Sequence, residues 1–258
     1  MQLIDTHCHP DYFGDQLPAV LQRASEAFVT EMIACGTNPD DWPIHLKDAT
    51  TYSNLHYTVG IHPTNIDQTW ERGLEILETY CTKTPKPVAI GEIGLDYHEI
   101  TGDTTVIIAL QKEVFRQQLL IAKRHNLPVV VHSRNAFEDC ITVIEQAKVD
   151  WQKIVVHCFS EGPEAIRRLN DRGARGSFTG IITYKSAENV RQALLAQGIE
   201  RLMLETDSPY LAPVPYRSKQ NEPAYVRAIA SFSANLLRIS EEELSNVTTR
   251  NARAFFHL

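Results

Sequence analysis

The chain has 258 residues, 43% of them hydrophobic and 22% charged, a composition that excludes a disordered or fibrous protein. Its formal charge of -7 at pH 7 argues against tight binding of nucleic acid through a broad basic surface. That charge does not exclude a nuclease, because bound divalent cations offset carboxylates locally.

The five cysteines form no Cys-x-x-Cys pair, which argues against a disulfide framework and fits a reducing compartment. The chain starts without a basic segment followed by an apolar one, and it holds no run of about 18 apolar residues. We therefore expect a cytoplasmic protein that does not associate with membranes.

Eight short apolar runs rich in β-branched residues recur along the chain, each of a length suited to a buried strand. They are residues 2–6, 31–35, 57–61, 87–91, 128–132, 153–157, 174–179 and 201–206. Segments with helical spacing separate most of them, namely residues 17–28, 71–80, 105–125, 136–148, 163–171 and 187–196. This alternation predicts an α/β fold, a TIM-type (β/α)8 barrel, with an open doubly wound sheet as the alternative.

Two more helical segments, residues 222–237 and 241–256, follow the last apolar run as extra C-terminal helices. The second is preceded by Ser240, with Glu243 three residues later, which is a capping box. No Pro/Gly/Ser-rich or charged stretch marks a linker, so we expect one domain over residues 1–258.

Polar side chains follow the predicted strands at their carboxyl ends. His7 and His9 are separated by one residue, so they share a face of the first strand and can grip one metal ion. The other strand-end residues are His62, Glu92, His132, His157, Glu205 and Asp207. In a barrel these ends converge on one mouth, whereas an open sheet would spread them too far apart to share ions.

Four imidazoles and two carboxylates suit two divalent ions. We assign His7, His9 and Asp207 to one ion, and His132 and His157 to the other, with Glu92 as a bridge. Two such ions hold a hydroxide as nucleophile and polarise the attacked oxygen, which predicts a hydrolase in which Asp207 and Glu92 are catalytic. The structural alternatives to metal binding are that Asp207 caps a helix and that Glu92 forms a salt bridge at the end of its strand.

The metal itself stays open between Mg, Mn and Zn. A mixed set of nitrogen and oxygen ligands suits Zn, Mn, Ni or Fe better than Mg, which prefers oxygen. The remaining histidines lack a strand-end position and are expected on the surface or in packing. They are His45, His56, His98, His125 and His257.

The sequence around these positions resembles the TatD family of metal-dependent deoxyribonucleases, within the amidohydrolase-like barrel enzymes. The segments are DTHCHPD (5–11), GIHP (60–63), GEIGLDYH (91–98), PVVVHSRNA (128–136), HCFSE (157–161), SFTGIITYKSA (177–187) and ETDSPYLAP (205–213). They span nearly the whole chain in the expected order. The resemblance implies the same metal residues that the strand-end argument selects.

The resemblance also implies which residues face the phosphate or the scissile group: His62, Arg134, Arg217 and Asn221. Arg217 has a planar guanidinium that can bind a phosphate with two hydrogen bonds. The structural alternative is that Arg217 is a solvated charge on a loop. Glu205 is expected to orient a ligand or a water from behind the metal residues. The implied substrate is DNA, single-stranded or frayed and trimmed from a 3′ end. The sequence itself makes no obligate protein partner evident.

Some positions depart from the family's pattern, and each lies near the proposed mouth. They are Asn135, Glu161, Ser218 and Gln220, within stretches that usually read HSRDA, HCFSG and RGKRNEP. These changes remove positive charge and add negative charge, which would weaken the binding of a polyanion. The sequence therefore supports metal-dependent hydrolysis more strongly than nuclease activity. The alternatives are a carboxylic ester, lactone or aminoacyl-tRNA hydrolase, or a non-catalytic protein that binds a metal or nucleotide.

Overall fold

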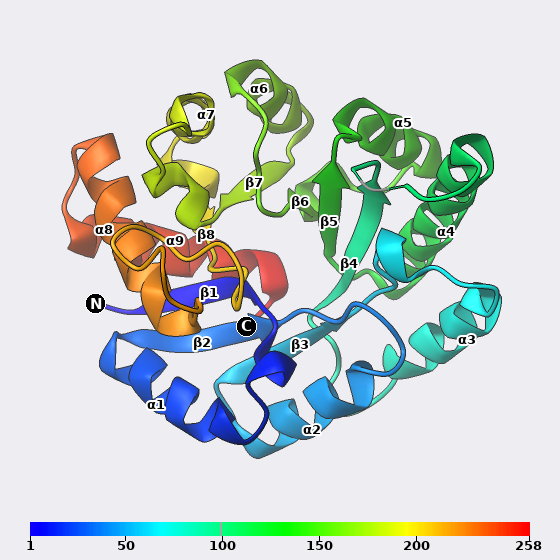
Figure 1. Ribbon diagram of the computed structural model, residues 1–258, viewed down its shortest axis with the longest axis horizontal. Coiled ribbons are helices and arrows are strands. Elements are labelled where there is room, and N and C mark those ends of the chain that lie inside the picture. Colours follow the sequence, from blue (N-terminus) through cyan, green and yellow to red (C-terminus); the bar gives the residue numbers. More distant parts are fainter. Residues whose placement is uncertain (99) are drawn as a thin grey trace. The chain divides into compact units, whose positions relative to one another are not determined.

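The computed structural model describes residues 1–98 and 100–258. The strands of this part of the chain are β1 (Leu3–Cys8), β2 (Val29–Ala34), β3 (Leu55–Val59), β4 (Ala89–Asp96), β5 (Val129–Arg134), β6 (Ile154–Val156), β7 (Arg175–Phe178) and β8 (Met203–Leu204). Their order in the sheet is the order of the chain, and the assigned pairs are parallel (Figure 1). A doubly wound sheet would not be sequential, so the predicted (β/α)8 barrel class is confirmed.

Helices lie between the strands much as the spacing predicts. They are α1 (Leu17–Glu26), α2 (Trp42–Thr51), α3 (Trp70–Tyr80), α4 (Thr104–His125), α5 (Phe137–Ala147), α6 (Pro163–Arg172), α7 (Glu188–Gln197), α8 (Val226–Leu237) and α9 (Glu241–Phe256). The expected cap of α9 is present, because the Glu243 N–H donates to Ser240 Oγ at 3.0 Å. No helix within the described ranges has both the length and the apolar character needed to cross a membrane.

Helix α2 was missing from the sequence prediction. It ends in Thr50 and Thr51, whose hydroxyls donate back to the carbonyls of Leu46 and Lys47 at 2.8 Å. β-branched residues with such bonds have weak helix propensity, so the local pattern gave little helical signal. Tertiary packing stabilises the helix instead, since the fully buried Trp42 donates from Nε1 to the Gly60 carbonyl at 3.3 Å.

The described chain divides into two compact units. Unit 1 comprises Met1–Ala34, Ser53–His56 and His157–Leu258, and unit 2 comprises Cys35–Tyr52 and Tyr57–Val156. Unit 1 therefore holds β1, β2, β7 and β8, whereas unit 2 holds β4, β5, β6 and most of β3. The expectation of a single domain stays a prediction.

In unit 1, α9 packs against β1 and β8, the strands that lead into the predicted metal residues (Figure 1). The hydroxyl of Thr249 donates to the Gln2 carbonyl at 2.8 Å. The buried Asn251 amide donates to the carbonyls of Ile199 and Leu202 at 2.9 and 3.0 Å. The C-terminal helix thus fixes the starts of both strands.

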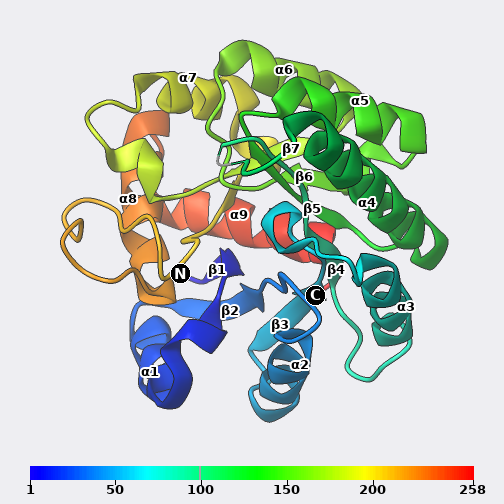
Figure 2. The ribbon, with the colours of Figure 1, turned by 45° about the vertical axis from the view of Figure 1, so that its right-hand side comes forward.

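In unit 2, the long helix α4 runs beside α5 and β4 in both ribbon views (Figure 2). Two buried glutamines of α4 tie it to strand ends. Gln118 accepts from the Ile61 N–H at 2.7 Å and donates to the Ile61 carbonyl at 3.1 Å. Gln111 makes the same pair of bonds with Asp96, at 3.0 and 3.1 Å. These amides hold the backbone at the two points where polar side chains leave the strands.

Candidate metal centres

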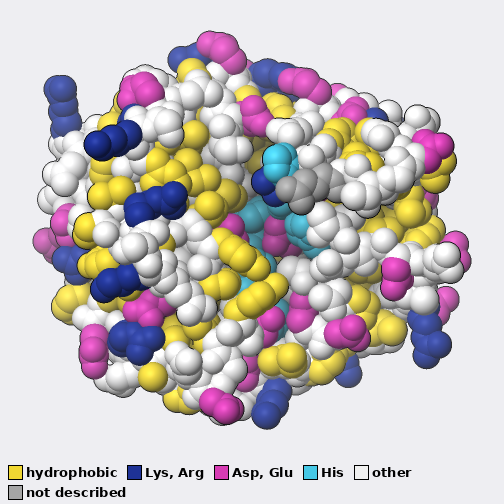
Figure 3. Space-filling view, viewed as in Figure 1, with side chains coloured by type: hydrophobic (Ala, Val, Ile, Leu, Met, Phe, Trp, Pro, Cys, Tyr) yellow, Lys and Arg dark blue, Asp and Glu magenta, His cyan; other side chains and the backbone are white. Residues whose placement is uncertain are grey.

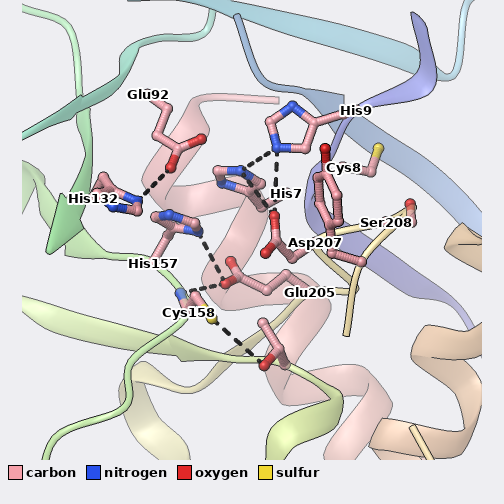
Figure 4. A network of polar contacts seen from close by, with 12 residues as sticks. His7, Cys8, His9, Glu92, His132, His157, Cys158, Glu205, Asp207 and Ser208 are labelled. Carbon is pink, nitrogen blue, oxygen red and sulfur yellow. Dashed lines mark hydrogen bonds and ion pairs between the residues drawn. The ribbon is translucent and has the colours of Figure 1, made fainter. Parts of the chain in front are cut away.

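In unit 1 the structure brings together His7, His9 and Asp207. The Nε2 atoms of His7 and His9 are 3.3 Å apart. Asp207 Oδ1 lies 3.6 Å from His7 Nε2 and 3.4 Å from His9 Nε2 (Figure 4). His7 is fully buried, and His9 is 6% exposed. Two imidazole nitrogens and a carboxylate oxygen therefore face one point, although Asp207 is about 200 residues away along the chain.

Backbone bonds hold these segments in register. The Asp207 N–H donates to the His7 carbonyl at 2.9 Å, and the His9 N–H donates to the Ser208 carbonyl at 2.8 Å. Cys8 and Ser208 form a parallel β-bridge between the same segments. The positions of the three donor atoms are thus set by main-chain pairing, which gives them little freedom to separate.

The buried carboxyl of Asp5 reinforces the same junction. It accepts hydrogen bonds from the Thr206 N–H at 2.8 Å and from the Thr206 hydroxyl at 2.5 Å. Burial raises the pKa of Asp5 to about 8, and the bonds from Thr206 lower it only in part. Asp5 thus anchors β1 to the segment after β8 behind the metal cluster.

The pKa of Asp207 moves in the opposite direction. Burial raises it, but the hydrogen bond with His9 and the charges of His7 and His157 outweigh burial, so the pKa lies below its ordinary value. The carboxylate is therefore ionised at neutral pH, the form that binds a cation.

His157 and Glu205 also lie in unit 1, beside His7. The His157 ring stacks on the His7 ring with centroids 3.9 Å apart and planes at 9°. Glu205 accepts from the Cys158 N–H at 2.5 Å, and its Oε1 is 3.5 Å from His157 Nδ1 (Figure 4). Glu205 also accepts from the Ser177 hydroxyl at 2.5 Å. Glu205 is buried with these donors and contacts His157, and its role in orienting a ligand or a water stays a prediction.

In unit 2 the imidazole of His132 lies between two carboxylates. His132 Nδ1 is 2.8 Å from Glu92 Oε1, and His132 Nε2 is 3.0 Å from Asp96 Oδ2. His62 joins them, with its Nε2 3.4 Å from Glu92 Oε1 and its ring 4.3 Å from that of His132. The structure thus places His62 with the predicted metal residues Glu92 and His132.

Asp96 was missed by the sequence analysis. The strand was expected to end at Gly91, whereas β4 continues to Asp96. Alternation along that longer strand puts residues 92, 94 and 96 on one face, and this signal could have found Asp96. Burial raises the pKa of Asp96, but bonds from His132 and the His98 N–H, with the charges of His132 and His62, lower it overall.

Two of the predicted substrate residues are exposed arginines. Arg217 is exposed on the loop after β8, with its guanidinium carbon 3.8 Å from the centroid of the Tyr184 ring and Nη1 3.4 Å from the Ala212 carbonyl. Arg134 is exposed at the end of β5. Both are accessible to an anion.

Asn221 is placed differently from the expectation that it faces a phosphate. It is fully buried, and its amide donates to the carbonyls of Thr206 at 2.9 Å and Tyr210 at 2.5 Å. Its Oδ1 accepts from the Glu222 N–H at 3.0 Å. The side chain is committed to holding the loop after β8, which is a structural role that a motif alone does not reveal.

The donor sets of both units fit divalent metal ions. Each holds imidazole nitrogens and carboxylate oxygens from different segments, with the imidazoles buried in unit 1 and partly exposed in unit 2, which is the ligand chemistry of Zn and Mn sites. Such clusters beside the carboxyl ends of parallel strands define a metal-dependent hydrolase.

Comparison with known proteins gives the family. Residues 4–257 match the model of the TatD related DNases. A metal-dependent hydrolase of Escherichia coli, YcfH, is 37% identical over 264 residues, covering 100% of this chain and 97% of that protein. YabD of Bacillus subtilis is 34% identical, covering 99% of each. The crystal structure of the TatD homologue YjjV from Escherichia coli superposes with a TM-score of 0.92 at 29% identity, covering 99% and 98%. The chain belongs to the TatD family of metal-dependent hydrolases.

Proposed function

We propose that the protein is a deoxyribonuclease that removes nucleotides from the 3′ end of single-stranded or frayed DNA. The observation that carries the proposal is the convergence of His7, His9 and Asp207 within 3.6 Å of one another in a chain of the TatD related DNase family. The cytoplasmic location expected from the sequence stays a prediction.

His7, His9 and Asp207 would hold one ion, and Glu92 with His132 would hold another. That His157 joins His132 on the second ion, and that Glu92 bridges both, stays a prediction from the sequence. When bound, divalent ions supply a water of lowered pKa as the nucleophile and positive charge for the phosphoryl oxygens. The mixed donors favour Zn or Mn over Mg, which prefers oxygen ligands.

Asp207 has two tasks in this proposal. One carboxylate oxygen faces the imidazoles of His7 and His9, and the other is available to accept a proton from the attacking water. The lowered pKa keeps this carboxylate in its basic form at neutral pH. Glu205, bonded to Cys158 and Ser177, keeps His157 in place.

Arg217 would bind the phosphate. Stacking on Tyr184 uses the face of the guanidinium and leaves its N–H edge for two hydrogen bonds to phosphate oxygens. Among Asp and Glu side chains, Figure 3 shows several Lys and Arg side chains along the left of the face drawn. They add favourable charge for a polyanion despite the net charge of -7.

The test combines metal analysis with a substrate panel. Purified protein is analysed for its metals and assayed, with Zn, Mn or Mg added, on single-stranded DNA, p-nitrophenyl esters and lactones. DNA labelled at the 5′ end should shorten in a ladder, whereas DNA labelled at the 3′ end should lose its label at once. Turnover of carboxyl esters alone would reject the nuclease and favour the ester hydrolase reading. Bound metal with no turnover on any substrate would favour a binding protein.

A further inference from the structure

Two exposed tyrosines lie beside the candidate metal ligands of unit 1. Tyr12 is 59% exposed and Tyr210 is 50% exposed, which is unusual for side chains with so large an apolar surface. Their ring centroids are 5.9 Å apart with planes at 71°. Both rings also make edge contacts with His9, at 6.2 and 6.4 Å between centroids. The two tyrosine rings and the His9 imidazole therefore form one continuous aromatic cluster.

The backbone links each tyrosine to a candidate ligand in the same way. The Tyr12 N–H donates to the His9 carbonyl at 3.3 Å, and the Tyr210 N–H donates to the Asp207 carbonyl at 3.0 Å. Asp207 has a φ of 56°, and this left-handed conformation turns the chain so that Tyr210 comes back toward it. Each tyrosine is therefore fixed three residues after a ligand by a turn closed on that ligand.

Further bonds stabilise this arrangement from behind. The buried Asn221 amide donates to the Tyr210 carbonyl, and the Asn221 N–H donates to the Pro209 carbonyl at 3.1 Å. The structure thus holds Tyr210 in place while leaving half of its surface exposed. An exposed aromatic pair with a fixed backbone loses little conformational entropy when a flat ligand stacks on it.

We propose that Tyr12 and Tyr210 form a stacking site for the terminal nucleobase of a single-stranded substrate. The inference rests on the proposed function and names how that substrate is held. Every nucleobase has a π-face, so stacking on tyrosine binds single strands with little sequence preference. The rings carry no charge, so they bind a polyanion without needing a basic surface, which suits a chain with a net charge of -7. A base in a duplex is already stacked and paired, so the site favours frayed or single-stranded ends.

The test compares ends that differ only in the base. Oligonucleotides carry either an ordinary 3′-terminal nucleotide or an abasic tetrahydrofuran residue, and the ratio of their KM values measures how much the base contributes. Wild-type enzyme should prefer the base-bearing end by roughly five- to a hundred-fold. Y12A and Y210A should each reduce that preference, the double variant should remove most of it, and Y12F and Y210F should restore it. Phe28→Ala, which removes another exposed aromatic ring of unit 1, is the matched control and should keep the wild-type ratio.

A second readout separates this inference from the nuclease proposal. Binding of oligonucleotides with non-hydrolysable phosphorothioate linkages is followed by fluorescence anisotropy, with thermal unfolding to confirm that each variant is folded. Base-dependent binding that Y12A and Y210A each reduce, and that the double variant mostly removes, supports the stacking site even if no DNA is cleaved. An equal loss on base-bearing and abasic ends would overturn it, because the tyrosines would then act only by packing against His9. Absence of any base preference in wild-type protein would overturn it as well.

Discussion

In unit 1 two imidazoles, those of His7 and His9, share one carboxylate, whereas in unit 2 one imidazole, that of His132, lies between two carboxylates. The first arrangement offers two imidazoles and one carboxylate to a cation, whereas the second, with His62, offers two imidazoles and two carboxylates. In unit 2 each ring nitrogen of His132 contacts a carboxylate, Glu92 or Asp96, so polar contacts within the protein already engage both nitrogens. In unit 1 the three donor atoms are best satisfied together by a metal ion.

This difference has a consequence for metal binding. Nitrogen-rich sites favour Zn and its neighbours, while oxygen-rich sites accept harder ions such as Mn and Mg. We therefore expect the ion held by His7, His9 and Asp207 to bind more tightly than the ion held by Glu92 and His132.

The largest effect is expected from His9→Ala. Loss of one of three ligands should remove the tighter ion and lower kcat/KM by roughly a thousand-fold or more, because the attacking water loses the ion that lowers its pKa. Elemental analysis and steady-state kinetics check this together. His257→Ala, on an exposed histidine that follows α9 in unit 1, should retain both metal and activity. Full metal content in His9→Ala would show that this cluster is not the metal site.

His132→Ala is expected to come next. It should lower turnover by roughly a hundred-fold or more, while the fold and the tighter ion are retained. The readouts are circular dichroism, metal content and activity measured as Mn is titrated in. His125→Ala, whose imidazole instead contacts Glu78 on a surface helix of unit 2, is the control. Normal activity in His132→Ala would refute a role for the second cluster.

The sequence predicted the barrel class because apolar β-branched runs and helical segments alternate with unusual regularity. Strand ends were less predictable. β1 extends to Cys8 and β4 to Asp96, beyond the apolar runs, because buried polar residues continue the strands. The helix α2 was missed because its Thr-rich end carries weak local signal.

The candidate ligands were predictable from their positions at strand ends, since parallel strands bring those ends to the same side. Residues that act by positioning another side chain or a loop were not predictable in this way. Asp96 lies in a quoted motif, yet its contact with His132 depends on where β4 ends. Asn221 was expected to face substrate, but its burial follows from the path of the loop after β8, which no periodicity encodes.

Asp96→Asn is expected to have a smaller effect than loss of a ligand. The amide can still contact His132, but it removes the negative charge that favours one ring orientation and raises ligand basicity. A loss of roughly 10- to 100-fold in metal affinity or activity is expected, and excess metal should restore part of it. Asp139→Asn, on a surface carboxylate of unit 2 bonded to Lys112 and Tyr97, is a matched control. If excess metal restores nothing, Asp96 contributes to the reaction itself rather than to holding His132.

The smallest effect is expected from Ser177→Ala. The Ser177 hydroxyl donates to Glu205 Oε2 at 2.5 Å, while Glu205 Oε1 keeps its bond from the Cys158 N–H. Losing one hydrogen bond to a buried charged group costs about 1.5–3 kcal/mol of stability, measured as a lower free energy of unfolding in urea. Activity should fall only several-fold, because Glu205 stays in place through Cys158 and still orients His157. Ser233→Ala removes a buried hydroxyl that donates to Ile229 within α8, and it should leave activity unchanged. Should Ser177→Ala instead match Asp96→Asn in its loss, the orientation of His157 would matter as much as that of His132, and the two units would be more alike than their donor sets suggest.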